Sequence, residues 1–229
     1  MTDSNPLDGT RTLCPMNTVD YRPLLRAALL RLDLWARAGD PPPPSQYPRL
    51  ADGTAVRRDT TEGLFSGIPG MRFPTRLPRA ARNDFGPEVE RGIVTTLPPI
   101  PGQPFPAFVA AIDRDGNETA GIRLPDLTAP LGTHTGWNPR HKQIGAPGQL
   151  TNLIGATVPF AATQQAREAG GDPRPSIAER YSGKNPYLDQ VRQAAQHLIA
   201  EGYLLGEDLE LVVDQAADRF DVFTRPDGA

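Results

Sequence analysis

Hydrophobic side chains recur at helical spacing first in residues 21–38, where about every third or fourth position is apolar. The residues of this stripe are Leu24, Leu25, Ala28, Leu29, Leu32 and Trp35. Asp20 is a suitable N-cap, and Pro23 is tolerated in a first turn because the N–H groups there have no helical partner. Gly39 is a natural helix end. The pattern therefore predicts one long N-terminal helix.

The same periodicity returns in the last third of the chain, where it predicts a short helix and then a long one. Ser176 can cap the short helix. Asn185 as N-cap and Pro186 in the first turn predict the start of the long helix, and Gly202 predicts its end. The apolar face of the long helix comprises Leu188, Val191, Ala195, Leu198 and Ile199.

A last helix is predicted to begin near Glu207 and Asp208, because carboxylates are favourable at the positive end of the helix dipole. Its apolar stripe comprises Leu209, Val212, Val213, Ala216, Ala217 and Phe220. Only a few residues connect this helix to the one before it. We therefore predict that the two pack together as an antiparallel helical hairpin.

A β-hairpin is predicted in residues 108–124, where two β-prone runs flank the turn sequence Asp-Gly-Asn at 115–117. The Asp-x-Asp-x-Asn spacing that starts at Asp113 also opens an EF-hand calcium loop. Such a loop needs glycine at its sixth position and glutamate at its twelfth, and this chain has Glu118 and Leu124 there. We therefore predict a hairpin and no calcium site.

Prolines dominate the chain between the first helix and the hairpin. Residues 39–54 include four consecutive prolines, which favour a stiff polyproline II segment. This segment is either a ligand for a proline-recognising domain or a rigid strap, and we favour the strap. In residues 55–104, eight prolines oppose long elements, so we predict one short strand at 91–97 and otherwise extended chain over a surface. Residues 138–160 are expected to be rich in loops.

These elements predict an α+β fold, with one long N-terminal helix, Pro-rich extended segments, a β-hairpin and a C-terminal helical hairpin. We divide the chain into residues 1–40 with the long helix, 41–104 with the Pro-rich straps, and 105–229 with the hairpin and helical region. We expect all three to form one compact unit.

Composition and charge support a folded protein and exclude some partners. The 26 prolines and 22 glycines together make 48 of 229 residues, which is below the roughly 25–30% share that indicates disorder. The net charge of −3 implies no basic face, so we expect no nucleic-acid partner. No apolar run approaches the roughly 20 residues that span a bilayer, and the N-terminus has no signal pattern. We therefore expect a cytoplasmic protein without a membrane span.

The chain has a single cysteine, Cys14. An intrachain disulfide and a zinc site built on cysteines are therefore impossible. Since no histidine lies near Cys14 in the sequence, we expect a free structural thiol in a loose N-terminal segment rather than a nucleophile.

The stretch LGTHTGWNPRH at 131–141 contains two of the three histidines. His134 and His141 are seven residues apart, but Gly136 and Pro139 between them oppose the helix that would bring both to one metal. His134 could instead act as a general base, with Asp113 or Asp126 as the acid that orients it. We favour a structural corner, in which Gly132 and Gly136 permit positive φ, the threonines bond to nearby backbone, and Trp137 anchors a core.

No nucleophile motif completes a catalytic site. An α/β-hydrolase nucleophile requires Gly-x-Ser-x-Gly on a strand-to-helix turn, and the chain contains no such pentad. Ser66 comes nearest, but Gly63 precedes it by three residues rather than two, so we predict a turn there. No Gly-rich phosphate loop follows a predicted strand. We therefore predict no catalytic, metal-binding or cofactor-binding residues, and no cofactor.

Three long stretches carry a family resemblance. They are DYRPLLRAALLRLDLWARAGDPPPPSQYPRLADGT at 20–54, DRDGNETAGIRLPDLTAPLGTHTGWN at 113–138 and GDPRPSIAERYSGKNPYL at 171–188. In content and order they resemble a family of uncharacterised bacterial α/β-hydrolase-domain proteins. The resemblance covers nearly the whole chain but only the C-terminal portion of those longer proteins.

The resemblance implies how this chain would relate to a complete hydrolase. Residues 1–40 would then hold the closing helix of the hydrolase-like core. The catalytic N-terminal half, with the nucleophile and the triad histidine, would lie outside this chain. No catalytic residue is therefore carried over to a position of this sequence.

Three functions remain open at this point. The first is a C-terminal domain that completes or covers the active site of an esterase-type hydrolase without being catalytic alone. The second is a stand-alone interaction module with a proline-rich surface. The third is an independent hydrolase that uses Ser66 or Asp113 with His134. The expected partners are the missing hydrolase half or a second copy of the chain.

Overall fold

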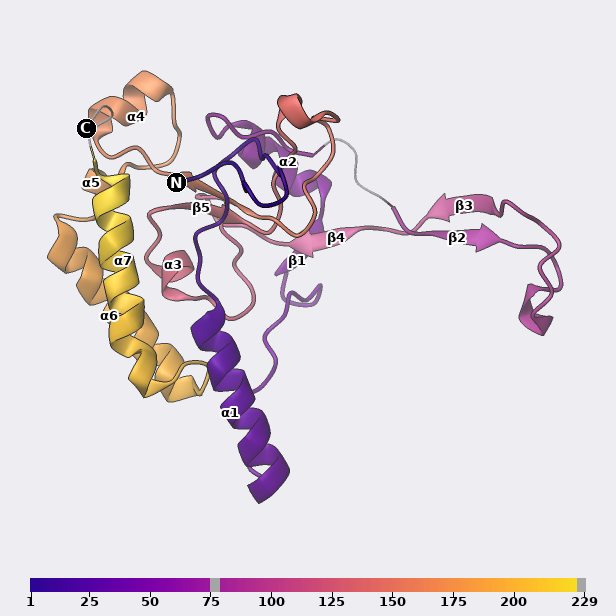
Figure 1. Cartoon of the computed structure of the whole chain (residues 1–229), viewed down its shortest axis with the longest axis horizontal. Coiled ribbons are helices and arrows are strands. Elements are labelled where there is room, and N and C mark those ends of the chain that lie inside the picture. Colours follow the sequence, from indigo (N-terminus) through magenta and orange to yellow (C-terminus); the bar gives the residue numbers. More distant parts are fainter. Residues whose placement is uncertain (75–78, 226–229) are drawn as a thin grey trace.

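The computed structural model describes residues 1–74 and 79–225. It shows a body with mixed α and β elements from which two extensions project, the helix α1 and the hairpin β2–β3 (Figure 1). The helices are α1 Arg22–Ala38, α2 Asp59–Ser66, α3 Pro125–Thr128, α4 Gln164–Gly170, α5 Ile177–Arg180, α6 Lys184–Glu201 and α7 Leu209–Phe223, with 3-10 turns at Val89–Arg91, Lys142–Ile144 and Gly206–Asp208. The strands are β1 Ala55–Arg57, β2 Ala81–Asp84, β3 Ile100–Pro104, β4 Phe108–Ala110, β5 Gly132–Thr135 and β6 Ala156–Pro159.

The C-terminal helical hairpin is confirmed, with α6 and α7 packed side by side (Figure 1). Ser176 caps α5 as predicted, and the structure adds a capping box with Glu179. Helix α6 ends at Gly202, which has left-handed backbone geometry. The prediction of Asn185 as N-cap is wrong, because the helix starts two residues earlier, at Lys184, and its N-cap position is Gly183.

A single large core lies between the helical hairpin and the rest of the body. Its buried members from α6 and α7 include Tyr187, Val191, Leu198, Val212, Val213, Ala216 and Phe223. Leu131 and Phe160, which flank the strands β5 and β6, join the same core. The helices therefore cover the region that holds the β5–β6 pair and fix its position.

The sheets of the described residues are three antiparallel strand pairs, β1–β4, β2–β3 and β5–β6. The predicted hairpin is confirmed only between residues 111 and 119, where the N–H of Thr119 donates to Ala111 O at 2.9 Å. The strand β4, at the start of the predicted hairpin, pairs with β1 instead, with Ala55 opposite Ala110. Residues 120–124 leave the hairpin to reach α3, so the predicted second strand is too long.

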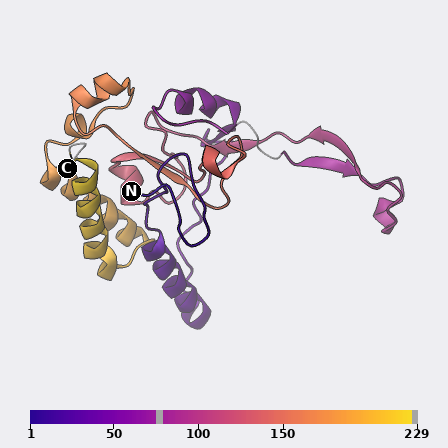
Figure 2. The ribbon, with the colours of Figure 1, turned by 45° about the horizontal axis from the view of Figure 1, so that its top comes forward.

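Residues 55–104 contain more structure than their prolines suggested. The helix α2 was not predicted, and it is short enough to end before Pro69. The strand predicted at 91–97 is wrong, because Arg91 ends a 3-10 turn and the residues after it are irregular. The strands of this region are β1, β2 and β3, and β2 pairs with β3 in an arm that projects away from the body (Figures 1 and 2). Pro101 and Pro104 are tolerated in β3 because the strand is at an edge.

Helix α1 matches its predicted range, and Gly39 ends it in left-handed geometry. Asp20 accepts a hydrogen bond from the N–H of Arg22 at 3.0 Å, although the N-cap position itself is Tyr21. Within α1 only Pro23 and Ala27 are buried. The apolar stripe is exposed, with Leu25, Leu29, Leu32 and Trp35 each more than half accessible to solvent.

The polyproline segment runs back beside α1 and leaves a groove of about 420 Å³ between them. The Tyr203 hydroxyl fastens this segment by donating to Pro44 O at 2.5 Å and accepting from Gln46 Nε2 at 3.1 Å. The apolar residues that line the groove include Leu24, Leu25, Ala28, Leu32, Trp35, Pro42, Pro43, Pro44, Ile122 and Tyr203.

The N-terminal segment is packed against the body rather than loose, which corrects the prediction. Thr12 forms a bridge with Arg140, and Met16 forms one with Ala156. Cys14 is buried and free, and burial raises the pKa of its thiol. Burial and a raised pKa both make the thiol unreactive, as a structural cysteine requires.

None of the described helices combines the length and apolarity that crossing a bilayer requires.

Candidate functional site

The hairpin turn at 113–117 builds one wall of the candidate site. Asp113 Oδ1 accepts hydrogen bonds from the N–H groups of Asp115 and Asn117, each at 3.0 Å, and closes the turn. Gly116 has φ of 79°, and a Cβ there would meet Thr133 Cγ2 at 2.9 Å. Glycine is therefore required both for the backbone geometry and for the close contact with β5.

The Asn117 side chain joins this turn to β5 in the way that a neighbouring strand would. Its Nδ2 donates to Gly132 O at 3.0 Å, and its Oδ1 accepts from the N–H of His134 at 2.8 Å. On the other edge, β5 pairs with β6, where His134 lies opposite Thr157. The backbone of His134 is therefore held from both sides.

The imidazole of His134 is buried, and its Nδ1 lies 3.0 Å from Thr157 Oγ1. Burial, together with the positive charge of Arg219, lowers the pKa of His134 to about 3. The ring is therefore neutral at physiological pH. A general base is most effective when its pKa is near the working pH, so His134 is a weak base.

Two arginines, the buried Arg174 and the partly buried Arg180, support β5 and the turn. Arg174 is 2% exposed and binds Asp172 through Nε at 2.9 Å and Nη2 at 2.6 Å. Its remaining donors reach Thr133 Oγ1, Val158 O and Pro159 O. Burial would raise the pKa of Asp172, but the hydrogen bonds from Arg174 outweigh that effect and the pKa is lowered. Both partners are therefore charged, and every donor of the guanidinium has an acceptor.

The second arginine, Arg180, binds Asp115 through both terminal nitrogens, with Nη1 at 2.8 Å from Oδ2. Its guanidinium also lies over the ring of Phe160, 4.1 Å from the centroid. Asp115 is thus fully engaged, and Asp113 is used by the turn and by Arg123 at 3.4 Å. These carboxylates serve structure, as the hairpin prediction implies. Among the described residues, no three or more His, Cys, Asp or Glu side chains gather as a metal site would need.

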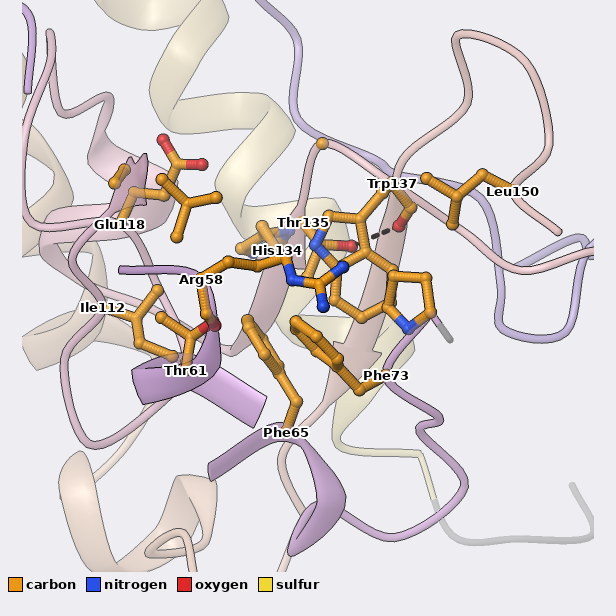
Figure 3. A pocket seen from close by; sticks show the side chains of 15 residues that line it. Arg58, Thr61, Phe65, Phe73, Ile112, Glu118, His134, Thr135, Trp137 and Leu150 are labelled. Carbon is orange, nitrogen blue, oxygen red and sulfur yellow. Dashed lines mark hydrogen bonds between the residues drawn. The ribbon is translucent and has the colours of Figure 1, made fainter. Parts of the chain in front are cut away.

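In front of His134 lies a pocket of about 150 Å³ with an aromatic wall (Figure 3). Phe65 comes from α2, Phe73 from the chain after it, and Trp137 from the turn after β5. The Trp137 ring meets Phe65 edge to face at 5.2 Å and Phe73 at 5.9 Å, while the two phenylalanines are 6.0 Å apart. Trp137 thus anchors a core, as the sequence indicates.

The polar groups of the pocket come from different elements. Arg58, just before α2, is half-buried and extends over the pocket toward the aromatic side (Figure 3). Glu118 lies on the other side with its carboxylate directed away from the rings (Figure 3). Partial burial raises the pKa of Glu118, although the side chain still reaches solvent. Thr61 and Thr135 complete the lining, and both hydroxyls already donate to backbone carbonyls, of Arg58 and Trp137.

The residues weighed as catalytic partners of His134 do not form hydrogen bonds with it. Ser66 ends α2, and its Oγ donates to Glu62 O at 2.9 Å. Asp126 is buried and pairs with Arg219 at 2.9 Å. His141 caps the 3-10 turn at Lys142–Ile144 through its Nδ1, 3.2 Å from the N–H of Gln143. In the described part of the chain, the ring of His134 bonds only to Thr157.

One expectation for the structural corner at residues 131–141 was wrong, and it concerns the backbone of its two glycines. Gly132 and Gly136 do not have positive φ. Gly132 is needed because it lies in β5, where a Cβ would come within 2.8 Å of Val158 O. Thr135 Oγ1 donates to Trp137 O at 2.5 Å, so the threonine contact with nearby backbone is confirmed.

Sequence reasoning missed the residues that give the pocket its character: Arg58, Phe65 and Phe73. Thr61 and Phe65 are four residues apart and form the buried face of α2, and this spacing was a weak signal for the helix. The nearby prolines obscured it. That Arg58 and His134 line one pocket leaves no mark in the sequence, because the two are 76 positions apart.

Comparison with known families gives one match. The profile of a family described as alpha/beta hydrolase domain matches residues 2–214, almost the whole chain. No curated protein and no solved structure shows significant similarity to the chain.

Proposed function

Since the chain belongs to the alpha/beta hydrolase domain family, we propose that it is a non-catalytic domain of an esterase-type hydrolase. In this role it docks against the unit that carries the nucleophile, and it completes or covers the active site. The nucleophile itself is supplied by that other unit.

The sequence motifs and the geometry of the chain support its assignment as the non-catalytic domain. It contains no Gly-x-Ser-x-Gly pentad, the motif that presents the nucleophile of this fold at a strand-to-helix turn. The described sheets are antiparallel pairs, whereas an α/β-hydrolase nucleophile stands at the top of a larger sheet. His134 is neutral, a weak base and bonded to Thr157.

The observation that carries the proposal is the exposed apolar face of α1. Leu29 is 69% exposed and Trp35 is 53% exposed, on a helix that projects from the body (Figure 1). A contiguous apolar patch of this kind marks an interaction surface. We infer the partner of this face from the family, because the resemblance places α1 as the closing helix of a hydrolase core. The proposed partner is therefore that core.

The β2–β3 arm adds a second exposed apolar surface. Its side chains include Ile93, Val94, Leu97 and Ile100, and Leu97 is 77% exposed. A projecting arm with exposed apolar side chains can contact a neighbouring unit. We propose that both extensions face the catalytic unit and that the body sets the distance between them.

A catalytic assay tests the first half of the proposal. The purified chain should hydrolyse p-nitrophenyl acetate and butyrate no faster than its His134→Gln variant. Robust turnover that a serine-directed phosphonate abolishes would show that the chain has its own nucleophile, and would refute the non-catalytic role.

A binding assay tests the second half. The chain should form a one-to-one complex with a co-expressed segment that contains Gly-x-Ser-x-Gly and is encoded next to it in the genome, as measured by light scattering after size exclusion. Leu29→Glu should weaken this complex at least ten-fold, because it places a charge in the apolar interface. Leu7→Glu is the matched control, since Leu7 is 94% exposed and is not part of α1.

The same complex separates the main proposal from the alternative of a stand-alone interaction module. If the chain completes a hydrolase, the esterase activity of the partner should rise when the complex forms and fall again with Leu29→Glu. A complex without any change of activity would favour the interaction module. Equal affinity of wild type and Leu29→Glu would exclude α1 as the docking surface.

A further inference from the structure

We propose that the pocket in front of His134 binds a small carboxylate with a benzene-sized apolar group, and that the Arg58 guanidinium pairs with its carboxylate. This ligand site belongs to the chain by itself and does not depend on docking to a catalytic unit.

The size and lining of the pocket select the apolar part of the ligand. The volume is about 150 Å³, a size that holds one benzene ring. Phe65, Phe73 and Trp137 present one aromatic wall, and Val109 and Ile112 contribute aliphatic surface. Aromatic walls favour a flat ring through edge-to-face or offset contacts. A single aryl group or a short branched acyl chain is therefore the matching occupant.

The charge of the pocket selects the polar part. No carboxylate of the described residues pairs with Arg58, although Arg57 beside it pairs with Asp59 at 3.6 Å. Arg58 extends over the pocket toward the rings, so its guanidinium is near the place where a bound ring would carry its substituent (Figure 3). A guanidinium matches a carboxylate with two parallel hydrogen bonds. Glu118 is the acid of the lining, and its carboxylate points the other way.

A second hollow strengthens the positive field on the same side. It shares Arg58 with the aromatic pocket, and Arg79 adds a second positive charge, whereas the charge of Arg57 is offset by its pairing with Asp59. Of the residues that line this hollow, only Asp59 is acidic, and it is paired with Arg57. An anion approaching Arg58 therefore meets a region of net positive charge.

His134 contributes a polar but uncharged ring to the lining of the pocket. Because its ring is neutral, Arg58 is the cation that the ligand would meet within the pocket. A second anionic group on the ligand would have no such partner inside the pocket. The site therefore favours a monocarboxylate over a dicarboxylate.

The test uses benzoate as the probe and Trp137 as the reporter. The Trp35→Phe variant leaves Trp137 as the only tryptophan, because the chain has two. Benzoate should change the Trp137 emission with a dissociation constant below about 1 mM, and calorimetry should give the same constant. Benzyl alcohol, which has the ring without the charge, and acetate, which has the charge without the ring, should each bind at least ten-fold more weakly.

Variants of the two neighbouring arginines assign the carboxylate contact. Arg58→Gln should weaken benzoate binding by about 10- to 100-fold, the usual loss for hydrogen bonds to a charged group. Arg57→Gln is the matched control and should change the affinity less than two-fold. Arg58→Lys, which keeps the charge but loses the paired geometry, should fall between wild type and Arg58→Gln and guards against a folding defect.

Three results would overturn the proposal. They are no saturable benzoate binding at 10 mM, equal affinity for benzoate and benzyl alcohol, or an effect of Arg57→Gln as large as that of Arg58→Gln. Each result can occur whether or not the chain docks to a catalytic unit. The failure of this proposal is therefore distinct from failure of the proposed function.

Discussion

The helices α1 and α7 have similar apolar stripes and opposite surroundings. In α7 the stripe is covered by α6, and Val212, Val213, Ala216 and Phe223 are buried. In α1 the stripe faces solvent, and only Pro23 and Ala27 are buried. An apolar stripe in the sequence predicts an amphipathic helix but does not show whether the stripe is covered within the same chain. The difference therefore separates a covered helical hairpin from an extension whose apolar side chains are exposed.

The same contrast holds for charged groups. In the body, Arg174 is buried and bonded to five acceptor atoms of four residues. In the arm, Arg91 pairs with Glu88 at 3.1 Å while 75% of its side chain is exposed. Breaking a buried pair leaves an uncompensated charge, whereas an exposed pair contributes little. The predictions below use these contrasts, from the largest expected effect to the smallest.

The largest effect is expected from removing a side chain of the covered helix. Phe223→Ala should lower the free energy of unfolding by about 3–5 kcal/mol, because it leaves a cavity in the main core. Leu29→Ala in α1 should change it by less than about 0.5 kcal/mol. Urea unfolding followed by circular dichroism measures both. A cost above 2 kcal/mol for Leu29→Ala would show that α1 is covered within this chain.

Removing the buried arginine tests the contrast in charge. Arg174→Met should cost roughly 3 kcal/mol, the lower end of the usual range, because Asp172 retains some access to solvent. The matched change in the arm, Arg91→Gln, should cost less than about 1 kcal/mol. Similar unfolding midpoints for the two variants would contradict the division into body and extensions.

The packed N-terminal segment is tested through its link to Asn138. This buried side chain exchanges hydrogen bonds with the N–H and C=O of Cys14 at 3.1 and 2.9 Å. Asn138→Ala should cost about 1–3 kcal/mol because it leaves these buried groups unpaired. It should also speed the reaction of Cys14 with a thiol reagent in the native protein. An unchanged rate would mean that other contacts hold the segment.

Near neutral pH the smallest effect is expected from His134, and this effect grows on acidification. Its pKa is about 3 in the folded protein, whereas it is near 6.5 in an unfolded chain. Between these values the unfolded chain binds a proton that the folded protein does not. Stability should therefore fall as the pH decreases from about 6.5, by roughly 1.4 kcal/mol per pH unit.

The control for this effect is the same titration on His134→Gln, which lacks the group. Burial raises the pKa of Asp126, so the folded protein takes up this proton more readily than the unfolded chain does. Acidification therefore stabilises the folded protein through Asp126, which opposes the effect of His134. Because Asp126 is present in both proteins, the difference between their unfolding curves isolates the histidine. Parallel curves from pH 7 to pH 4 would show that His134 is accessible to protons in the folded state.

Much of the local structure could be predicted from the sequence. The range of α1, the ends at Gly39 and Gly202, the N-cap at Ser176 and the pairing of α6 with α7 depend on residues close in the chain. Spacing and capping chemistry act over a few residues, so they are visible in one dimension. The same reasoning failed in residues 55–104, where many prolines hid α2 and the arm.

The sequence by itself determined the helices α1, α5, α6 and α7, the turn at 115–117 and the absence of a nucleophile motif. Tertiary structure alone decided that β4 pairs with β1, that α1 stays uncovered, and that Arg58 meets the aromatic pocket beside His134. The physical reason is the range of the interactions involved. Capping and helical periodicity are local, whereas strand pairing, burial and the encounter of charge with an aromatic wall depend on segments far apart in the chain.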